Sequence, residues 1–162
     1  MNALIALGFK VKYSQLPTFQ KFCNCIPTHS GLDPKLGYND GTGAPTWQVW
    51  DFLSSLEGIW CSAGRATISI VEKALDSKAV LIVNVAVDPK DSDELHSVAV
   101  VKKTNKGFYV ANPQLCSLSN SNLTLAVIPR DLFIKFLQLG KRKADPLEPT
   151  SFILWTRTKE KQ

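Results

Sequence analysis

The segment from residue 94 to residue 114 constrains the fold of this chain more than any other stretch of it. Two strand-forming runs flank the polar stretch Lys103–Gly107, and this pattern predicts a β-hairpin. A histidine, His96, opens the first run, and an asparagine, Asn112, closes the second. The hairpin therefore brings an imidazole and an amide toward the same end of a sheet.

The register of this hairpin decides whether the two side chains can meet. A five-residue turn centred on Asn105 sets Val98 opposite Asn112, and His96 then lies diagonally from Asn112 on the same face. A two-residue turn at Asn105–Lys106 moves Asn112 to the other face, because a shift of one residue reverses the side chains of a strand. The predicted His96–Asn112 pair therefore requires the five-residue turn.

Strand signals before and after the hairpin predict a mainly antiparallel sheet. The run Ala79–Val87 is the strongest of them, and its two apolar faces predict a central position in the sheet. Further strands are predicted over residues 123–128 and 151–157. Because helices and strands do not alternate regularly, the pattern favours an α+β fold, a sheet packed against a few helices, over a doubly wound parallel sheet.

Capping and periodicity signals predict the helices. Residues 47–57 have an apolar stripe at helical spacing and form the first of them. The segment Ser69–Glu72 has the form of a capping box and begins a short helix that ends at Asp76. A third helix is predicted over residues 130–139, with Gly140 as its end.

The length of 162 residues suits one domain with a substantial core. We expect this domain to span residues 1–158 and residues 159–162 to form a flexible C-terminal tail. Residues 2–13 predict an edge strand or a short helix. No apolar run approaches the roughly 18 residues that a membrane helix needs, so no membrane partner is expected.

The four cysteines, at positions 23, 25, 61 and 116, are too few for a disulfide scaffold. They favour free thiols in a reducing compartment, and we expect a cytoplasmic monomer. The net charge of +5 allows an acidic partner without requiring one.

A cysteine near the start of the chain can supply a nucleophile for the histidine. Cysteine-based catalysis needs a thiolate, a base that takes its proton, a group that orients the base, and donors for the oxyanion. Cys25 follows Gln20 at a spacing of five residues, and Pro27 marks a helix start that would favour a thiolate. Cys23 is the alternative nucleophile, because one residue separates it from Cys25.

From His96 to Asn112-Pro113, with the apolar strand over residues 80–87 before it, the chain resembles the papain-like cysteine peptidase superfamily. The segment Cys25-Ile-Pro-Thr28 resembles the Cys-Gly-Pro-Thr/Ala motif of the peptidase domain of bacteriocin exporters. The segment 43–53 resembles the mid-domain helix of the Josephin family of deubiquitinating cysteine proteases.

The Josephin resemblance is the longer of the two, because residues 43–157 follow the order of elements in that family. It implies a papain-like fold and a cysteine peptidase or isopeptidase that acts on a protein or peptide, including ubiquitin-like proteins. It also implies four catalytic residues, namely Cys25 as nucleophile, His96 as general base, Asn112 as the group that orients the imidazole, and Gln20 as an oxyanion donor.

A papain-like domain without catalysis is the alternative function. Glycine and proline residues leave space for barely two helical turns after Cys25, and the bulky Ile26 follows it where the family has a small residue. Such a domain would bind a protein as an effector or inhibitor, in the host cytosol if the chain comes from a virus or bacterium.

The residues give weaker support to two other classes of function. Cys23, Cys25 and His29, with Cys61 or Cys116, could supply zinc ligands, but Cys-x-Cys is not the usual Cys-x-x-Cys knuckle. The stretch Lys106–Val110 is similar to an RNA-recognition strand, but the elements around it have the wrong order. We therefore expect no metal, no cofactor and no nucleic-acid partner.

Overall fold

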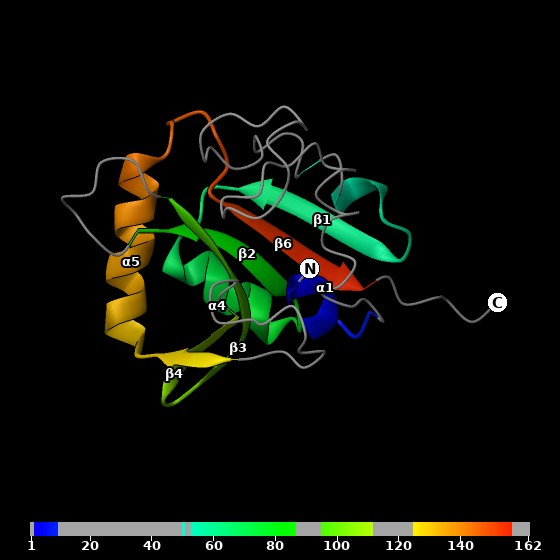
Figure 1. Cartoon of the computed structure of the whole chain (residues 1–162), viewed down its shortest axis with the longest axis horizontal. Helices are drawn as coiled ribbons and strands as arrows, with labels where there is room; N and C mark the ends of the chain where they lie inside the picture. Colours follow the sequence, from blue (N-terminus) through cyan, green and yellow to red (C-terminus); the bar gives the residue numbers. More distant parts are fainter. Residues whose placement is uncertain (1, 10–49, 51–52, 87–94, 112–124, 157–162) are drawn as a thin grey trace, which may run out of the picture.

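The computed structural model describes residues 2–9, 50, 53–86, 95–111 and 125–156. Six strands form one sheet in the order β1-β6-β2-β3-β4-β5, and every neighbouring pair is antiparallel (Figure 1). The strands are β1 (Ile59–Gly64), β2 (Val80–Val85), β3 (His96–Thr104), β4 (Gly107–Ala111), β5 (Ala126–Ile128) and β6 (Ser151–Thr156). The helices with defined bounds are α1 (Asn2–Ala6), α4 (Ile68–Asp76) and α5 (Arg130–Lys143). The predicted α+β class with an antiparallel sheet is confirmed.

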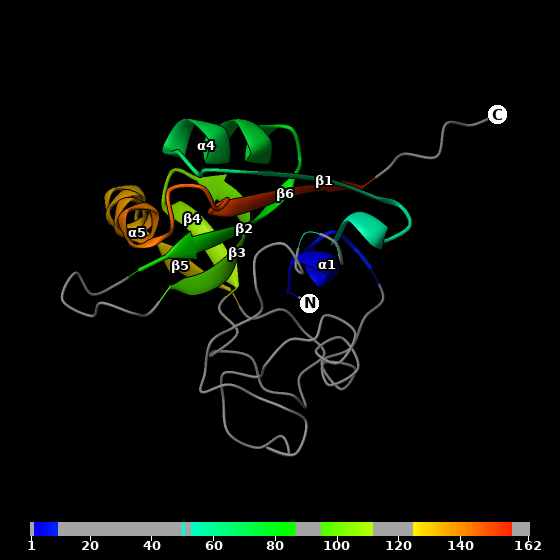
Figure 2. The same ribbon diagram turned by 90° about the horizontal axis from the view of Figure 1, so that it is seen from above.

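The sheet separates two hydrophobic clusters. One contains buried residues of α4, α5 and the inner strands, and we call the side of the sheet on which it lies the helix face. The other cluster includes Ala3 and Leu4 of α1, and we call its side the α1 face. Figure 2 shows α4 and α1 on opposite sides of the sheet. Residues 50 and 53–55 are also helical, and Leu53 is buried in the cluster of the α1 face.

Strand β2 is central, as its two apolar faces predict. It pairs with β3 on one side and with β6 on the other, so neither of its edges is exposed. Leu81 and Val83 pack on the helix face, and Val80 packs on the α1 face. A strand in which apolar and polar residues alternate can bury only its apolar face. Because β2 is apolar on both faces, both faces can be buried.

Of the two alternatives for the first segment, the short helix is confirmed, because Asn2–Ala6 form α1 and not an edge strand. The predicted start of α4 is wrong in detail. The N-cap of α4 is Thr67 and not Ser69, because the Thr67 side chain accepts a hydrogen bond from the Ile70 amide. Both residues have a cap-forming hydroxyl, and the first turn begins two residues earlier than the capping-box pattern suggested.

Gly140 does not end the last helix. Helix α5 continues through it to Lys143, and Gly140 is buried. A Cβ atom at this position would lie 2.5 Å from the carbonyl oxygen of Asn84 and 2.8 Å from the Cα atom of Val85. Glycine is therefore needed for the close approach of α5 to β2, and this packing outweighs the low helix propensity of glycine.

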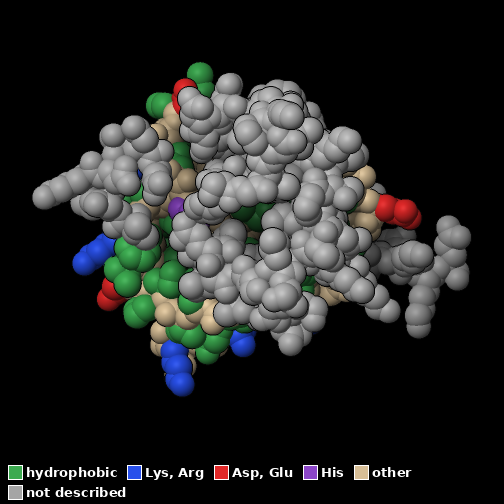
Figure 3. Space-filling view, viewed as in Figure 1, with side chains coloured by type: hydrophobic (Ala, Val, Ile, Leu, Met, Phe, Trp, Pro, Cys, Tyr) green, Lys and Arg blue, Asp and Glu red, His purple; other side chains and the backbone are tan. Residues whose placement is uncertain are grey.

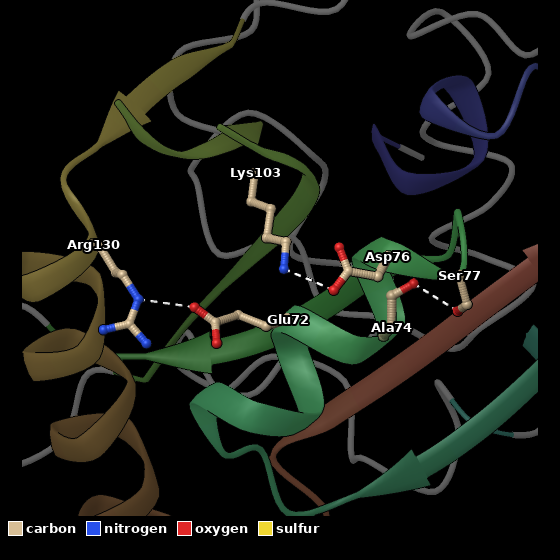
Figure 4. Close-up of polar contacts among 6 residues, drawn as sticks. All are labelled: Glu72, Ala74, Asp76, Ser77, Lys103 and Arg130. Atoms are coloured by element: carbon tan, nitrogen blue, oxygen red, sulfur yellow. Dashed lines mark hydrogen bonds and ion pairs between the residues drawn. The ribbon is translucent and has the colours of Figure 1, made fainter. Parts of the chain in front are cut away.

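Polar contacts fasten α4 to its neighbours on the helix face (Figure 4). Lys103 Nζ lies 2.8 Å from Asp76 Oδ2, and Arg130 Nε lies 2.8 Å from Glu72 Oε1. The hydrogen bond from Arg130 holds the pKa of Glu72 below its ordinary value. Both pairs are solvent-accessible, so they set the position of α4 more than they stabilise the fold.

The junctions before α4 and after α5 are joined by a second set of contacts. The Arg65 guanidinium donates to the carbonyl oxygens of Lys141, Asp145 and Glu148. The Thr150 amide donates to Gly64 O, and Thr150 Oγ1 accepts from the Ala66 amide. Carbonyl groups at the end of α5 are thus satisfied by a residue that is distant in sequence.

The turn of the β3–β4 hairpin differs from the prediction. Thr104 pairs with Gly107, so the turn has two residues, Asn105 and Lys106, and the predicted five-residue turn is wrong. Gly107 has a φ of 130°, and a Cβ atom there would collide with the backbone of Ile128. This position therefore requires glycine.

A β-bulge then changes the register within the same hairpin. Lys102 pairs with Tyr109, but the next pairs are Val100 with Val110 and Ala99 with Ala111. Val101 is therefore an extra residue on β3, and the register beyond it is shifted by one. The pairing of Ala99 with Ala111 is the register that the five-residue turn would have produced.

Candidate active site

The base of the β3–β4 hairpin contains the one predicted catalytic residue that lies within the described part of the chain. His96 is the first residue of β3, is half-buried, and pairs with Val85 of the central strand β2. Side chains alternate along a strand, so His96 lies on the same face as Val98 and Val100. Both valines belong to the hydrophobic cluster of the helix face, which places His96 on that face.

Helix α5 packs beside this end of the sheet. The Ala86 amide donates to Phe136 O over 3.1 Å, and Gly140 lies against the backbone of Asn84 and Val85. These contacts hold the strand next to His96 firmly against the helix. The backbone that positions His96 is therefore fixed by a neighbouring strand and by a packed helix, which is what a catalytic base requires of its support.

The other predicted site residues lie outside the described residues: Gln20, Cys23, Cys25 and Asn112, and also the alternative zinc ligands His29 and Cys116. The described residues that flank the segment 10–49 are Phe9 and Trp50, and both pack on the α1 face.

Cys61 is described, and its position excludes it as the partner of His96. It lies on β1 opposite Leu154, and both residues pack in the cluster of the α1 face. Strands β6 and β2 separate β1 from β3. A thiol and an imidazole on opposite faces, three strands apart, cannot exchange a proton directly.

Burial raises the pKa of the Cys61 thiol from 9.0 to about 11. Because burial disfavours the charged thiolate, the folded protein keeps Cys61 protonated at neutral pH. Cys61 is half-buried among apolar neighbours and has the character of a small hydrophobic residue.

We expect iodoacetamide to alkylate Cys61 about 100-fold more slowly in the folded chain than in the urea-unfolded chain near neutral pH, since thiolate fraction controls the rate. The folded rate should keep rising with pH toward 11, whereas the unfolded rate should level off near 9.0. Mass spectrometry of the peptide that contains Cys61 measures both rates. Equal rates in the two states at neutral pH would contradict the assignment.

No protein-family model, curated protein or solved structure matches the chain. Within the described residues, no group of three histidine, cysteine, aspartate or glutamate side chains is placed to hold a metal ion. In the same part of the chain, no helix is both long and apolar enough to cross a membrane.

A cavity of about 200 Å³ lies between the start of α4 and α5. Its wall is formed by residues 66–68 and by Ile134, Leu137, Gln138 and Lys141. None of these residues is a thiol, an imidazole or a carboxylate, so the cavity offers no nucleophile and no acid–base pair.

The sequence reasoning missed a row of side chains that the bulge creates on the α1 face. Lys102, Tyr109 and Val127 lie opposite one another on β3, β4 and β5. The ammonium group of Lys102 lies 4.3 Å from the centroid of the Tyr109 ring. The alternation of Phe108, Tyr109 and Val110 was a usable signal for an outward-facing tyrosine, but counting from the turn could not align it with Lys102.

Proposed function

We propose that the chain is a papain-like cysteine peptidase or isopeptidase, with Cys25 as nucleophile and His96 as general base. Asn112 would orient the imidazole, and Gln20 would donate to the oxyanion. Substrates of this activity are proteins or peptides, including ubiquitin-like proteins, and the cytosol is a suitable compartment for an enzyme that depends on a free thiol.

The observation that supports this proposal is the register at the base of the hairpin. The two-residue turn alone would have set positions 96 and 112 on opposite faces. The bulge at Val101 reverses this effect, and Ala99 pairs with Ala111 in the register that the His96–Asn112 pair needs. Bulges are frequent beside active sites, where they redirect a side chain.

The test is labelling by an electrophilic cysteine-protease probe, with and without an attached ubiquitin. We expect wild-type protein to label on Cys25 faster than a free thiol, and Cys25→Ala and His96→Ala to abolish this excess. Cys61→Ala and Ser97→Ala are the matched controls and should label like wild type. The Ser97 hydroxyl bonds Asn84 Oδ1, and Ser97 adjoins His96 on the opposite face, so its loss tests for general damage to the strand.

Three outcomes are decisive for this proposal. Labelling only by the ubiquitin-bearing probe would select the deubiquitinase branch. Labelling that moves to Cys23 would reassign the nucleophile. Labelling no faster than a free thiol, or equal in wild type and His96→Ala when both give the same circular dichroism spectrum, would exclude the peptidase.

A non-catalytic protein-binding domain is the second candidate function. The observation that favours it is the arrangement of the faces: His96 lies on the helix face, and the residues that flank the segment containing Cys25 pack on the α1 face. A fold of this kind does not require the chemistry of its relatives. Such a domain would act as an effector or inhibitor, and the failure of the probe experiment would select it.

A further inference from the structure

The row formed by Lys102, Tyr109 and Val127 is the centre of an exposed patch on the sheet. Val127 is 43 % exposed and Leu125, two residues before it, is 37 % exposed. Val101 and Tyr109 are half-buried. We call these five residues the Tyr109 surface: Val101, Lys102, Tyr109, Leu125 and Val127.

The Tyr109 surface lies on the α1 face of the sheet. Phe108 and Val110 belong to the cluster of the helix face, so Tyr109 between them points to the other side. Helix α1 packs against β2 and β3, and Leu125 and Val127 at the β5 edge of the sheet are exposed. Figure 3 shows hydrophobic side chains at the molecular surface over this end, at the lower left, with both basic and acidic side chains at their rim.

The bulge gives this surface its mixed chemistry. It sets the extra residue Val101 beside Lys102, opposite Tyr109. Lys102 Nζ lies 4.3 Å from the Tyr109 ring centroid, at a distance typical of a cation–π contact. An aliphatic group, an ammonium and an aromatic ring are therefore presented together.

Both signs of charge occur around this surface, because Asp131, an exposed carboxylate in the first turn of α5, follows shortly after β5. Lys103 and Arg130 are paired with Asp76 and Glu72 on the helix face, which neutralises them there. Lys102 and Lys106 are exposed, and no carboxylate of the described residues forms an ion pair with either. The patch thus has an apolar centre, with two exposed lysines at its β3–β4 end that form no ion pair with the described residues.

We propose that the Tyr109 surface docks an extended acidic peptide segment of a partner protein. An aliphatic or aromatic side chain of the segment packs on Tyr109 and Val127, and its carboxylates lie near Lys102 and Lys106. Aromatic residues with adjacent basic groups are typical centres of binding energy at protein interfaces.

Single-stranded nucleic acid suits this surface less well. Recognition of bases on a sheet requires several exposed aromatic rings. Phe108 is 1 % exposed, and one face of the Tyr109 ring is already in contact with Lys102. Val127 and Leu125 offer apolar packing but no ring to stack on.

This docking site lies on the face opposite to His96, so it is independent of the proposed peptidase chemistry. A protein that fails every labelling experiment can still bind the segment, and an active peptidase can lack the docking site. The two proposals therefore fail separately.

The test uses a phage-displayed library of random peptides selected on wild-type protein, followed by fluorescence anisotropy with the enriched peptides. We expect enriched peptides to combine acidic residues with an aromatic or aliphatic residue. Lys102→Glu and Tyr109→Ser should each weaken their binding about tenfold or more. Lys103→Gln, a change of the neighbouring lysine that faces α4, is the matched control and should bind like wild type.

Charge reversal gives a second test, because an unfolded variant would not gain binding to a peptide of opposite charge. The Lys102→Glu/Lys106→Glu variant should bind a lysine-substituted version of the enriched peptide better than wild type does. Peptides that bind wild type and Tyr109→Ser equally, or a selection that enriches no acidic peptide, would overturn the proposal. Tighter binding of oligothymidine than of any enriched peptide, lost in Lys102→Glu, would assign the surface to nucleic acid instead.

Discussion

Replacement of Phe133 by alanine is expected to lower the free energy of unfolding by about 3–5 kcal/mol. Phe133 is 0 % exposed at the centre of the helix-face cluster. Its ring lies 4.5 Å from that of Phe108, centroid to centroid, at an interplanar angle of 32°. The change removes this aromatic contact and leaves a cavity between α5 and β4, which the surrounding strands cannot close. Urea denaturation followed by circular dichroism measures the loss.

Leu132→Ala is the control for this prediction. Leu132 precedes Phe133 on α5 and is 42 % exposed. Its replacement should cost no more than about 1 kcal/mol, since much of the side chain already contacts water. If Leu132→Ala cost as much as Phe133→Ala, the burial of α5 described above would be wrong.

Gly140→Ala should also destabilise the protein, by about 1–3 kcal/mol, although the same change in an exposed helix stabilises it by about 1 kcal/mol. The added methyl group would lie 2.5 Å from Asn84 O and within 2.9 Å of two further backbone atoms of β2. Backbone atoms of a central strand cannot move aside cheaply. Helix α5 therefore has to shift away from the sheet, and the thermal unfolding midpoint should fall.

Gly64→Ala is the matched glycine control. A Cβ atom at Gly64 meets no atom within 4 Å. Its thermal unfolding midpoint should therefore stay close to that of wild type. A Gly140→Ala protein as stable as wild type would show that α5 does not approach β2 as closely as described.

The sequence predicted elements where one local signal determined the structure. The doubly apolar run at Ala79–Val87 predicted a central strand, and β2 is central. The strand-forming run over residues 151–157 predicted a further strand, and β6 spans Ser151–Thr156. These signals succeed because burial of apolar surface fixes both the face and the period of a strand.

The sequence could not predict features that depend on distant partners. Gly140 has the appearance of a helix end, and only the proximity of Asn84 and Val85 shows that it belongs inside α5. The two-residue turn and the bulge at Val101 shift the register in opposite directions. The pairing of Ala99 with Ala111 was therefore predicted correctly, although the predicted turn length was wrong. A bulge has no strong local signature, because it depends on which strands pair on both sides.

For the candidate site, the sequence placed His96 at the start of a strand, and this is confirmed. Cys61 lies on the other face of the sheet from His96 and is not the thiol that His96 would activate. The assignments of Gln20, Cys25 and Asn112 stay predictions. The row of Lys102, Tyr109 and Val127 could not be predicted, because the pairing of Tyr109 with Lys102 depends on the turn length and the bulge.

The contacts of Arg65 have a consequence for how the protein opens. One guanidinium joins the segment between β1 and α4 to three carbonyl groups at the end of α5 and in the segment that leads to β6. The edge strand β1 pairs with β6 along its whole length, so β1 cannot separate from the sheet without breaking these contacts as well. We therefore expect the Gly64 end of β1 to open together with the end of α5, and amide hydrogen exchange in the two segments to have similar rates.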